Sequence, residues 1–165
     1  MKTQVLDSKQ ISKMIKRMAY QIYESNFSEK ELILVGISGQ GYELAKLIQT
    51  ELEGICSIKI QLTQLDLNKS KPEESLINIM PDNIKYKNKS IIVIDDVLNT
   101  GKTLIYSCLP FLKWQVKKLQ VAVLVDRNHK NFPISADFIG ISLSTTLQEH
   151  IHVVMEKKKF NVYLE

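Results

Sequence analysis

Cysteine is scarce in this sequence, whose 165 residues include only Cys56 and Cys108. The two thiols have no metal-ligand spacing and follow no secretory signal, so we expect reduced thiols in a cytoplasmic protein. No apolar run approaches the length of a membrane span, and the first seven residues are too polar for the apolar part of a signal peptide. These absences argue against a membrane partner.

The sequence also has no long block of residues with the same charge. Lys and Arg exceed Asp and Glu by 22 to 18, which gives a net charge of +4 and a pI near 8.9, and the excess is spread along the chain. This balance suits an anionic ligand without requiring one. Hydrophobic residues make up 44% of the sequence, and no linker or repeat divides it, so we expect residues 1–165 to form a single globular domain.

Helical and strand patterns alternate along the chain. Apolar residues recur at spacings of three and four after an N-cap at Asp7 or Ser8, and the same spacing returns in two later segments. Continuous apolar runs between these segments predict strands that are buried on both faces. We therefore expect an α/β fold, with a mostly parallel sheet and helices on both of its faces. The expected helices are 8–25, 44–54 and 100–114, and the expected strands are 32–35, 55–67, 91–94, 119–125, 138–141, 151–155 and 161–164.

One long stretch, residues 68–89, shows no periodicity and is expected to be a long loop, which in a compact domain is usually functional or mobile. In a parallel sheet, ligands bind beyond the carboxyl ends of the strands. The turns at Gly36, at Asp95-Asp96 and at Asp126-Arg127 all follow predicted strands. We therefore expect these three turns to form one rim.

The stretch "VIDDVLNTGKT", residues 93–103, combines groups for two different ligand atoms. Backbone N–H groups of Thr100 to Thr103, at a turn that opens a helix, suit a phosphate, helped by the hydroxyls of Thr100 and Thr103. The carboxylates of Asp95 and Asp96 suit hydroxyl donors instead. A phosphate at one end and a diol at the other describe a ribose 5-phosphate.

Other interpretations of this stretch are weaker. Gly101-Lys102-Thr103 matches the end of a P-loop, but the glycine that this motif needs five residues earlier is Asp96. A receiver domain also ends a strand in an acidic pair, yet the 69 residues after Asp96 are too few for its remaining units. A purely structural turn is the third alternative, because Asp is common in turns.

The residues of this stretch resemble the phosphoribosyl-diphosphate (PRPP) binding motif of type I phosphoribosyltransferases. A second stretch, "VAVLVDRNHKNFPISADFIGISLST" at 121–145, resembles the PyrR family of pyrimidine-operon regulators and uracil phosphoribosyltransferases. The segment "VLDSKQISKMIKRMAYQI" at 5–22 and the strand end at 34–37 extend the likeness over most of the chain. The resemblance implies the type I phosphoribosyltransferase fold.

The resemblance also implies an activity and a set of site residues. The enzyme would transfer 5-phosphoribosyl from PRPP to a pyrimidine base, with uracil favoured, and release diphosphate. Mg²⁺ would arrive with the diphosphate rather than in a protein metal site. The resemblance further implies a homo-oligomer and a flexible loop at 68–80. The implied roles are ribose binding for Asp95 and Asp96, phosphate binding for Asn99, Thr100, Gly101, Lys102 and Thr103, diphosphate binding for Ile37, Ser38, Gly39 and Gln40, and base binding for Val125, Asp126, Arg127 and Ile139.

Two departures from the family pattern bear on catalysis. The diphosphate loop of the family commonly reads Lys-Thr-Arg-Gly, whereas this chain has Ser38-Gly39-Gln40-Gly41 and so lacks a cation there. The flexible loop usually carries Tyr-Arg-Asp-Asp, whereas residues 67–71 read Leu-Asn-Lys-Ser-Lys, in which Lys69 or Lys71 offers a point charge in place of a guanidinium. These departures favour an alternative, an RNA-binding pyrimidine regulator that uses the pocket as an effector site with little catalysis.

The remaining histidines give no clear metal site. His150 and His152 alternate on one predicted strand face, but no third ligand stands at a sensible spacing. We therefore expect no metal site made by the protein alone. His129 follows Arg127 in a polar loop, where a ligand or RNA contact and a solvated side chain are both open.

Overall fold

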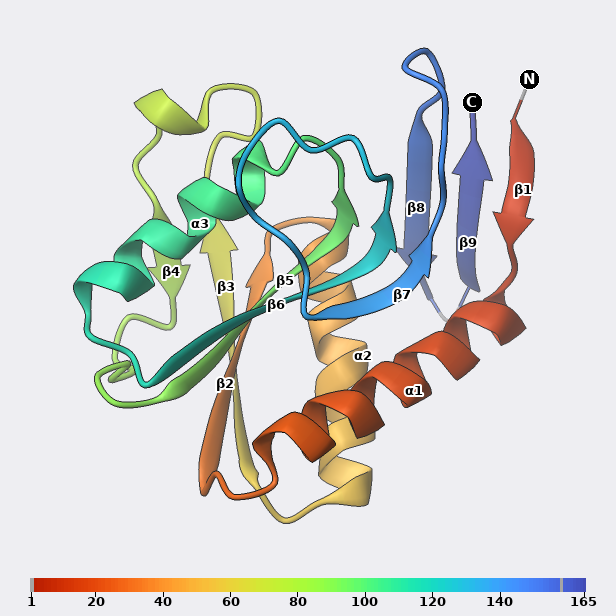
Figure 1. Ribbon diagram of the computed structural model, residues 1–165. Coiled ribbons are helices and arrows are strands. Elements are labelled where there is room, and N and C mark those ends of the chain that lie inside the picture. The colour runs from red at the N-terminus through yellow and green to blue at the C-terminus, as the bar shows by residue number, and fades with distance from the viewer. Residues whose placement is uncertain (1, 158) are drawn as a thin grey trace.

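The computed structural model describes residues 2–157 and 159–165 and contains two sheets (Figure 1). The larger sheet has the strand order β4-β3-β2-β5-β6-β7. Its neighbouring strands are parallel except for β4, which pairs antiparallel with β3 at the edge. The strands are β2 (Glu31–Ile37), β3 (Lys59–Asp66), β4 (Asn78–Met80), β5 (Ser90–Leu98), β6 (Lys118–Asp126) and β7 (Phe138–Ser142).

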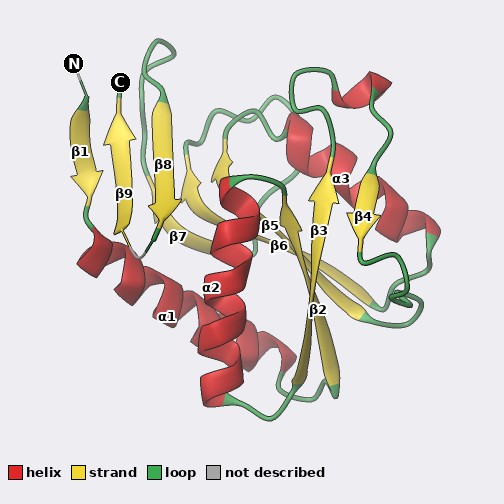
Figure 2. Ribbon diagram, turned by 180° about the vertical axis from the view of Figure 1, so that it is seen from behind, coloured by secondary structure: helices red, strands yellow, loops and turns green. Residues whose placement is uncertain are grey.

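Helices cover both faces of this sheet, as the sequence predicted (Figures 1 and 2). Alternate residues of the central strands, such as Leu34 and Ile92, pack against α1 (Ser8–Asn26) and α2 (Gln40–Ile55). Their neighbours, such as Ile33 and Val93, pack on the other face against α3 (Lys102–Lys113). All four side chains are fully buried, which explains why these strands are continuous apolar runs rather than alternating ones.

Helix α1 begins at a capping box. The Gln10 backbone N–H donates to Asp7 Oδ1 at 2.8 Å, and the Asp7 N–H donates to Gln10 Oε1 at 2.9 Å. Both bonds satisfy amides that the first turn of a helix leaves without partners. Asp7 is therefore the N-cap.

A second, antiparallel sheet stands beyond β7 with the strand order β1-β9-β8 (Figure 1). Its strands are β1 (Thr3–Leu6), β8 (Ile151–Glu156) and β9 (Lys159–Leu164), so the two ends of the chain lie side by side. The sequence patterns predicted β8 and β9 but not β1. In this short strand only Leu6 is buried, and its partners lie at the other end of the sequence.

The expectation of an irregular loop over residues 68–89 is wrong in part. The segment contains a short 3₁₀ helix, η1 (Pro72–Glu74), and the edge strand β4. Ile77 and Ile79 are half-buried and pack into the α3-side cluster, whereas Leu76, Asn78 and Met80 are exposed. This alternation is the signal in the sequence that could have predicted β4.

Among the residues that the structure describes, no helix combines the length and the apolar character that crossing a membrane requires.

Candidate active site

The predicted rim exists at the carboxyl ends of β2, β5 and β6. The Arg127 N–H, just past β6, donates to the Leu98 carbonyl oxygen at 3.0 Å, and the Ser38 N–H, just past β2, donates to Leu65 O at 2.8 Å. These bonds join the turns to neighbouring strand ends. The three turns that the sequence analysis singled out therefore form one continuous edge of the sheet.

The acidic pair lies on β5 in two different environments. Asp95 is buried, at 3% exposure, whereas Asp96 is half-buried. Asp95 Oδ1 accepts a hydrogen bond from the Asp96 N–H at 3.0 Å and lies 3.2 Å from Lys69 Nζ. Burial and, after it, the charge of Asp96 raise the pKa of Asp95 to about 8, against the lowering effect of Lys69. Asp95 is thus poised to change charge near neutral pH.

Gly41 explains how Asp95 comes to be buried. A Cβ atom at Gly41 would lie 2.8 Å from Asp95 Oδ1 and 2.9 Å from the Ile94 carbonyl oxygen. Only glycine lets the first turn of α2 approach β5 this closely. This role of Gly41 could not be predicted, because nothing in the sequence alone places α2 against Asp95.

The turn before α3, which is expected to bind phosphate, opens a helix as its sequence predicted. Gly101 adopts a left-handed φ of 86°, and α3 begins at Lys102 without a side-chain cap. First-turn amides of a helix have no intrahelical partners and favour an anion. The Thr100 carbonyl oxygen accepts from the Asn131 N–H at 2.8 Å and the Phe132 N–H at 3.1 Å, which fixes the turn. A hollow of about 50 Å³ lies here, lined by Asp95 and residues 97–104.

Two further features of this turn were not predicted. A Cβ atom at Gly101 would meet Ile134 Cγ2 at 2.6 Å, so the glycine is required by packing as well as by φ. Lys102 Nζ lies 2.9 Å from Glu73 Oε2 of η1. The lysine of the turn is therefore already paired with a protein carboxylate.

The turn after β2, which is expected to bind diphosphate, has backbone groups available to a ligand but no charged side chain. Ile37 is buried at the strand end, and Ser38 Oγ donates to Asp66 Oδ1 at 2.6 Å. Gly39 has a φ of 93°, and no atom lies within 4 Å of the position that a Cβ there would take. Gln40 Oε1 accepts a hydrogen bond from the Met155 N–H of β8 at 2.8 Å. The side chain of Gln40 is thus engaged with the small sheet.

The residues expected to bind the base are largely buried. Val125 is fully buried, and Asp126 Oδ1 accepts from the Asn128 N–H at 2.8 Å. Ile139 on β7 is half-buried, opposite Val123. Val125, Asp126 and Ile139 therefore lie on β6 and β7, close to the turn after β6.

Arg127 is buried, at 4% exposure, and is engaged on every side. Its guanidinium donates to Asn99 Oδ1 at 3.1 Å and to the Glu149 carbonyl oxygen at 2.6 Å. It also donates to Thr145 Oγ1 at 3.0 Å and to the Thr146 carbonyl oxygen at 3.2 Å. Arg127 therefore ties the phosphate turn to the loop that precedes β8, and its effect on a base would be indirect.

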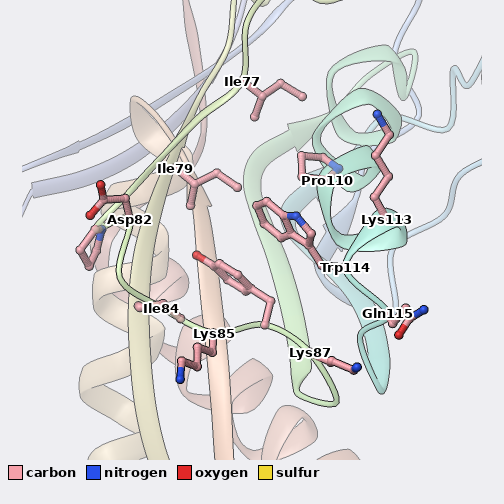
Figure 3. A pocket seen from close by; sticks show the side chains of 12 residues that line it. Ile77, Ile79, Asp82, Ile84, Lys85, Lys87, Pro110, Lys113, Trp114 and Gln115 are labelled. Carbon is pink, nitrogen blue, oxygen red and sulfur yellow. The ribbon is translucent and has the colours of Figure 1, made fainter.

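A groove of about 670 Å³ lies away from this rim, between the β4 hairpin and the end of α3 (Figure 3). Ile77 and Ile79 line one side, and Pro110 and Trp114 line the other. The ring of Tyr86 stacks on Trp114, with centroids 5.0 Å apart. None of the residues expected to bind PRPP lines this groove, which is mainly apolar.

Within the described residues, no group of three or more His, Cys, Asp or Glu side chains is placed to hold a metal ion. His152 Nε2 lies 2.9 Å from Glu165 Oε2, on the exposed small sheet. His129 Nε2 lies 2.6 Å from the Thr145 carbonyl oxygen.

Comparison with known proteins agrees with this geometry. The phosphoribosyl transferase domain family matches residues 1–158. A protein named bifunctional protein PyrR from Caldicellulosiruptor bescii is 33% identical over 93% of this chain and 88% of its own length. Its counterpart from Macrococcus caseolyticus is 34% identical over 98% of this chain and 97% of its own. The chain belongs to the PyrR family of phosphoribosyltransferases.

Solved structures support the fold of this PyrR family member. The hypoxanthine phosphoribosyltransferase of Trypanosoma cruzi superposes with a TM-score of 0.78, covering 97% of this chain and 95% of that one, at 14% identity. A hypoxanthine phosphoribosyltransferase from Staphylococcus aureus gives a TM-score of 0.72 at 21% identity, covering 86% and 77%. At such identities the likeness shows the type I phosphoribosyltransferase fold alone.

Proposed function

We propose that this PyrR family member transfers 5-phosphoribosyl from PRPP to a pyrimidine base, uracil, with release of diphosphate. One observation carries the proposal: β5 and the start of α3 bring the buried Asp95 and residues 100–103 around one hollow, and the half-buried Asp96 follows Asp95 on the same strand. Hydroxyl donors of a ribose suit the carboxylates, and the 5-phosphate suits the amides.

In this reaction a ring nitrogen of the base forms a bond to C1 of the ribose and loses its proton, which the leaving diphosphate takes up. The bond from C1 to the diphosphate oxygen breaks, and its electron pair leaves with the diphosphate. Asp95 and Asp96 hold the ribose hydroxyls, and the amides of Thr100 to Thr103 fix the phosphate end, so that C1 faces the turn at Gly39. The open backbone at Gly39 can approach the diphosphate closely.

The residues present fit a Mg²⁺ ion that is bound mainly by substrate. Mg²⁺ keeps several waters and takes one or two carboxylates beside phosphate oxygens. Asp96, which is half-buried at the rim, would supply such a carboxylate. When bound, the ion neutralises charge on the diphosphate.

The direct test is to incubate the protein with PRPP, Mg²⁺ and each nucleobase in turn and to measure diphosphate. Uracil should give the fastest release. Diphosphate release with a purine base alone would contradict the proposed substrate, and no release with any base, despite PRPP binding, would favour the regulator described below.

A second test addresses PRPP binding itself. Saturating PRPP with Mg²⁺, at about a hundredfold over its dissociation constant, should raise the melting temperature on the order of 5 to 10 °C. The double variant Asp95→Asn with Asp96→Asn should lose most of this gain, because it loses the charge-assisted bonds to the ribose. Asp82→Asn, an exposed carboxylate on the groove, is the control and should keep the gain. An unchanged gain in the folded double variant would refute the assignment.

A second candidate function is RNA binding by a regulator that uses the same pocket as an effector site. Helix α1 supports it, because Lys9, Lys13, Lys16 and Tyr20 share one exposed face at helical spacing. Lysines bind phosphates, and an exposed aromatic ring can stack on an unpaired base. The relatives are named bifunctional proteins, which is in keeping with a second role.

We also propose that the chain forms a homo-oligomer through the apolar groove. The groove is mainly apolar, Trp114 on its lining is 43% exposed, and the exposed Leu112 lies two residues before Trp114 in the chain. Exposed apolar surface of this kind often marks an interface between proteins. Asp82 and Lys113 lie on its lining, so both signs of charge are available to a second copy in a two-fold contact.

A further inference from the structure

Two ion pairs fasten the segment 68–80 onto the candidate active site. Lys69 Nζ lies 3.2 Å from Asp95 Oδ1, and Lys102 Nζ lies 2.9 Å from Glu73 Oε2. The two ion pairs have opposite polarity. The segment supplies the cation in the pair with Asp95 and the anion in the pair with Lys102. Helix η1, which carries Glu73, packs beside α3.

Each pair occupies a side chain that the proposed function needs for substrate. Lys102 belongs to the turn whose amides face the 5-phosphate, and a phosphate there would lie next to its ammonium group. The Glu73 carboxylate would then stand beside the phosphate as a like charge. Like charges in such proximity repel, so the carboxylate and the phosphate compete for Lys102.

The two pairs differ in how easily they open. The Asp95 carboxylate is 5% exposed, whereas the Glu73 side chain is 43% exposed. Exposed ion pairs are screened by solvent and contribute little, whereas the hydrogen bond from Lys69 Nζ to the buried Asp95 Oδ1 is shielded from solvent and can form whether or not Asp95 is ionised. The Glu73 end of the segment therefore opens first, and the Lys69 end stays in place.

The Lys102 hydrogen bond lowers the pKa of Glu73, which keeps this carboxylate ionised at neutral pH. Its neighbour Glu74 also carries a carboxylate on η1, but it pairs with Lys71 at 3.3 Å and not with the phosphate turn. The two adjacent carboxylates of this helix thus pair with different lysines, and only the lysine paired with Glu73 belongs to the candidate site.

We propose that Glu73 occupies Lys102 in the ligand-free protein as an internal substitute for phosphate, and that the phosphate of the substrate displaces it and releases the Glu73 end of the segment. This inference rests on the proposed function, because it takes the turn at 100–103 as the phosphate site. Glu73 thereby lowers the affinity of the site for phosphate and couples phosphate binding to opening of the segment.

The test uses inorganic phosphate as the probe and the backbone amides of residues 100–103 as reporters in NMR titrations. Glu73→Gln removes the competing charge and should tighten phosphate binding about two- to fivefold, the range that an exposed ion pair represents. Glu74→Gln removes the same charge one residue away and should leave the affinity unchanged. In a Lys102→Met background, Glu73→Gln should no longer tighten binding.

A second measurement follows the segment itself. The Glu74 N–H donates to the Lys71 carbonyl oxygen at 3.2 Å, and the Ser75 N–H donates to Pro72 O at 3.3 Å. Saturating phosphate should speed hydrogen exchange of these two amides in the wild-type protein. In Glu73→Gln their exchange should already be fast and insensitive to phosphate.

Two outcomes would overturn the inference while leaving the proposed function standing. Phosphate could shift the 100–103 amides with equal affinity in wild type, Glu73→Gln and Glu74→Gln, or it could leave exchange at Glu74 and Ser75 unchanged in the wild-type protein. A third outcome overturns both: phosphate and PRPP shift none of the amides at 100–103 in any variant.

Discussion

At the scale of single residues, the unequal environments of Asp95 and Asp96 give the site its pH response. If both adjacent carboxylates were always charged, they would repel each other and a phosphate bound at the neighbouring turn. Burial favours the protonated form of Asp95, with its pKa raised to about 8, and Lys69 is the group that opposes this. Ribose hydroxyls that donate to the carboxylate favour its charged form, so PRPP binding should release a proton near neutral pH.

The raised pKa of Asp95 also predicts how stability depends on pH. The folded chain binds this proton more tightly than the unfolded chain, whose Asp has a pKa of about 3.9. The contribution of Asp95 to stability is therefore complete below pH 4 and is lost as the pH rises towards about 8. The free energy of unfolding of the wild type should fall between pH 5 and 8, and Asp95→Asn should reduce this fall by on the order of 2 to 4 kcal/mol. Urea unfolding at each pH measures the difference.

Lys69→Met serves as the opposite variant in the same measurement. Loss of the cation raises the pKa of Asp95 further, so stability at pH 8 should fall below that of the wild type. If Lys69→Met and the wild type showed the same pH dependence, the Lys69–Asp95 pair would be absent in solution.

At the scale of elements, the sequence predicts what each element contains within itself. Burial leaves a pattern of apolar residues, which is periodic in helices and continuous in strands buried on both faces. This pattern predicted the helices 8–25, 44–54 and 100–114 and the strands 32–35, 91–94 and 119–125. Strands β1 and β4 were missed because each is short and depends on a distant partner. The acidic pair and the turn at residues 100–103 lie at one rim because both belong to a single strand–turn–helix unit, and their roles in ligand binding stay predictions.

Contacts between elements left no such signal. The pairing of Lys102 with Glu73, the close approach of Gly41 to Asp95 and the engagement of Arg127 by the loop before β8 join segments far apart in sequence. Gln40 is the clearest case. Its position suggested a diphosphate contact in place of the family's cation, whereas in the fold its amide oxygen joins α2 to β8.

Gln40 therefore predicts a stability effect at the scale of elements. Gln40→Leu leaves the Met155 N–H without its acceptor and should cost about 1 to 3 kcal/mol. Gln40→Glu keeps an acceptor at the same position and should stay close to the wild type. Unfolding in urea measures both variants, and equal stability of Gln40→Leu and the wild type would mean that the bond is not formed in solution.

At the scale of the whole molecule, α3 connects the candidate active site with the apolar groove. Its first turn faces the rim at Gly101, and its last turn lines the apolar groove at Trp114. The segment 68–80 touches both regions, because Glu73 pairs with Lys102 while Ile77 and Ile79 line the groove. A second copy that covers the groove would therefore hold the β4 end of this segment while the Glu73 end remains free to move.

Self-association through the groove is testable with two leucines. Leu112 on α3 is 64% exposed, next to the groove residues Lys113 and Trp114, and Leu147 is 85% exposed in the loop before β8. Leu112→Glu places a charge in an apolar contact and should shift the protein to monomers in sedimentation experiments. Leu147→Glu adds the same charge away from the groove and should leave the assembly unchanged. A wild-type protein that stays monomeric at high concentration would contradict self-association. A Leu147→Glu variant that dissociates as readily as Leu112→Glu would mean that the contact lies elsewhere.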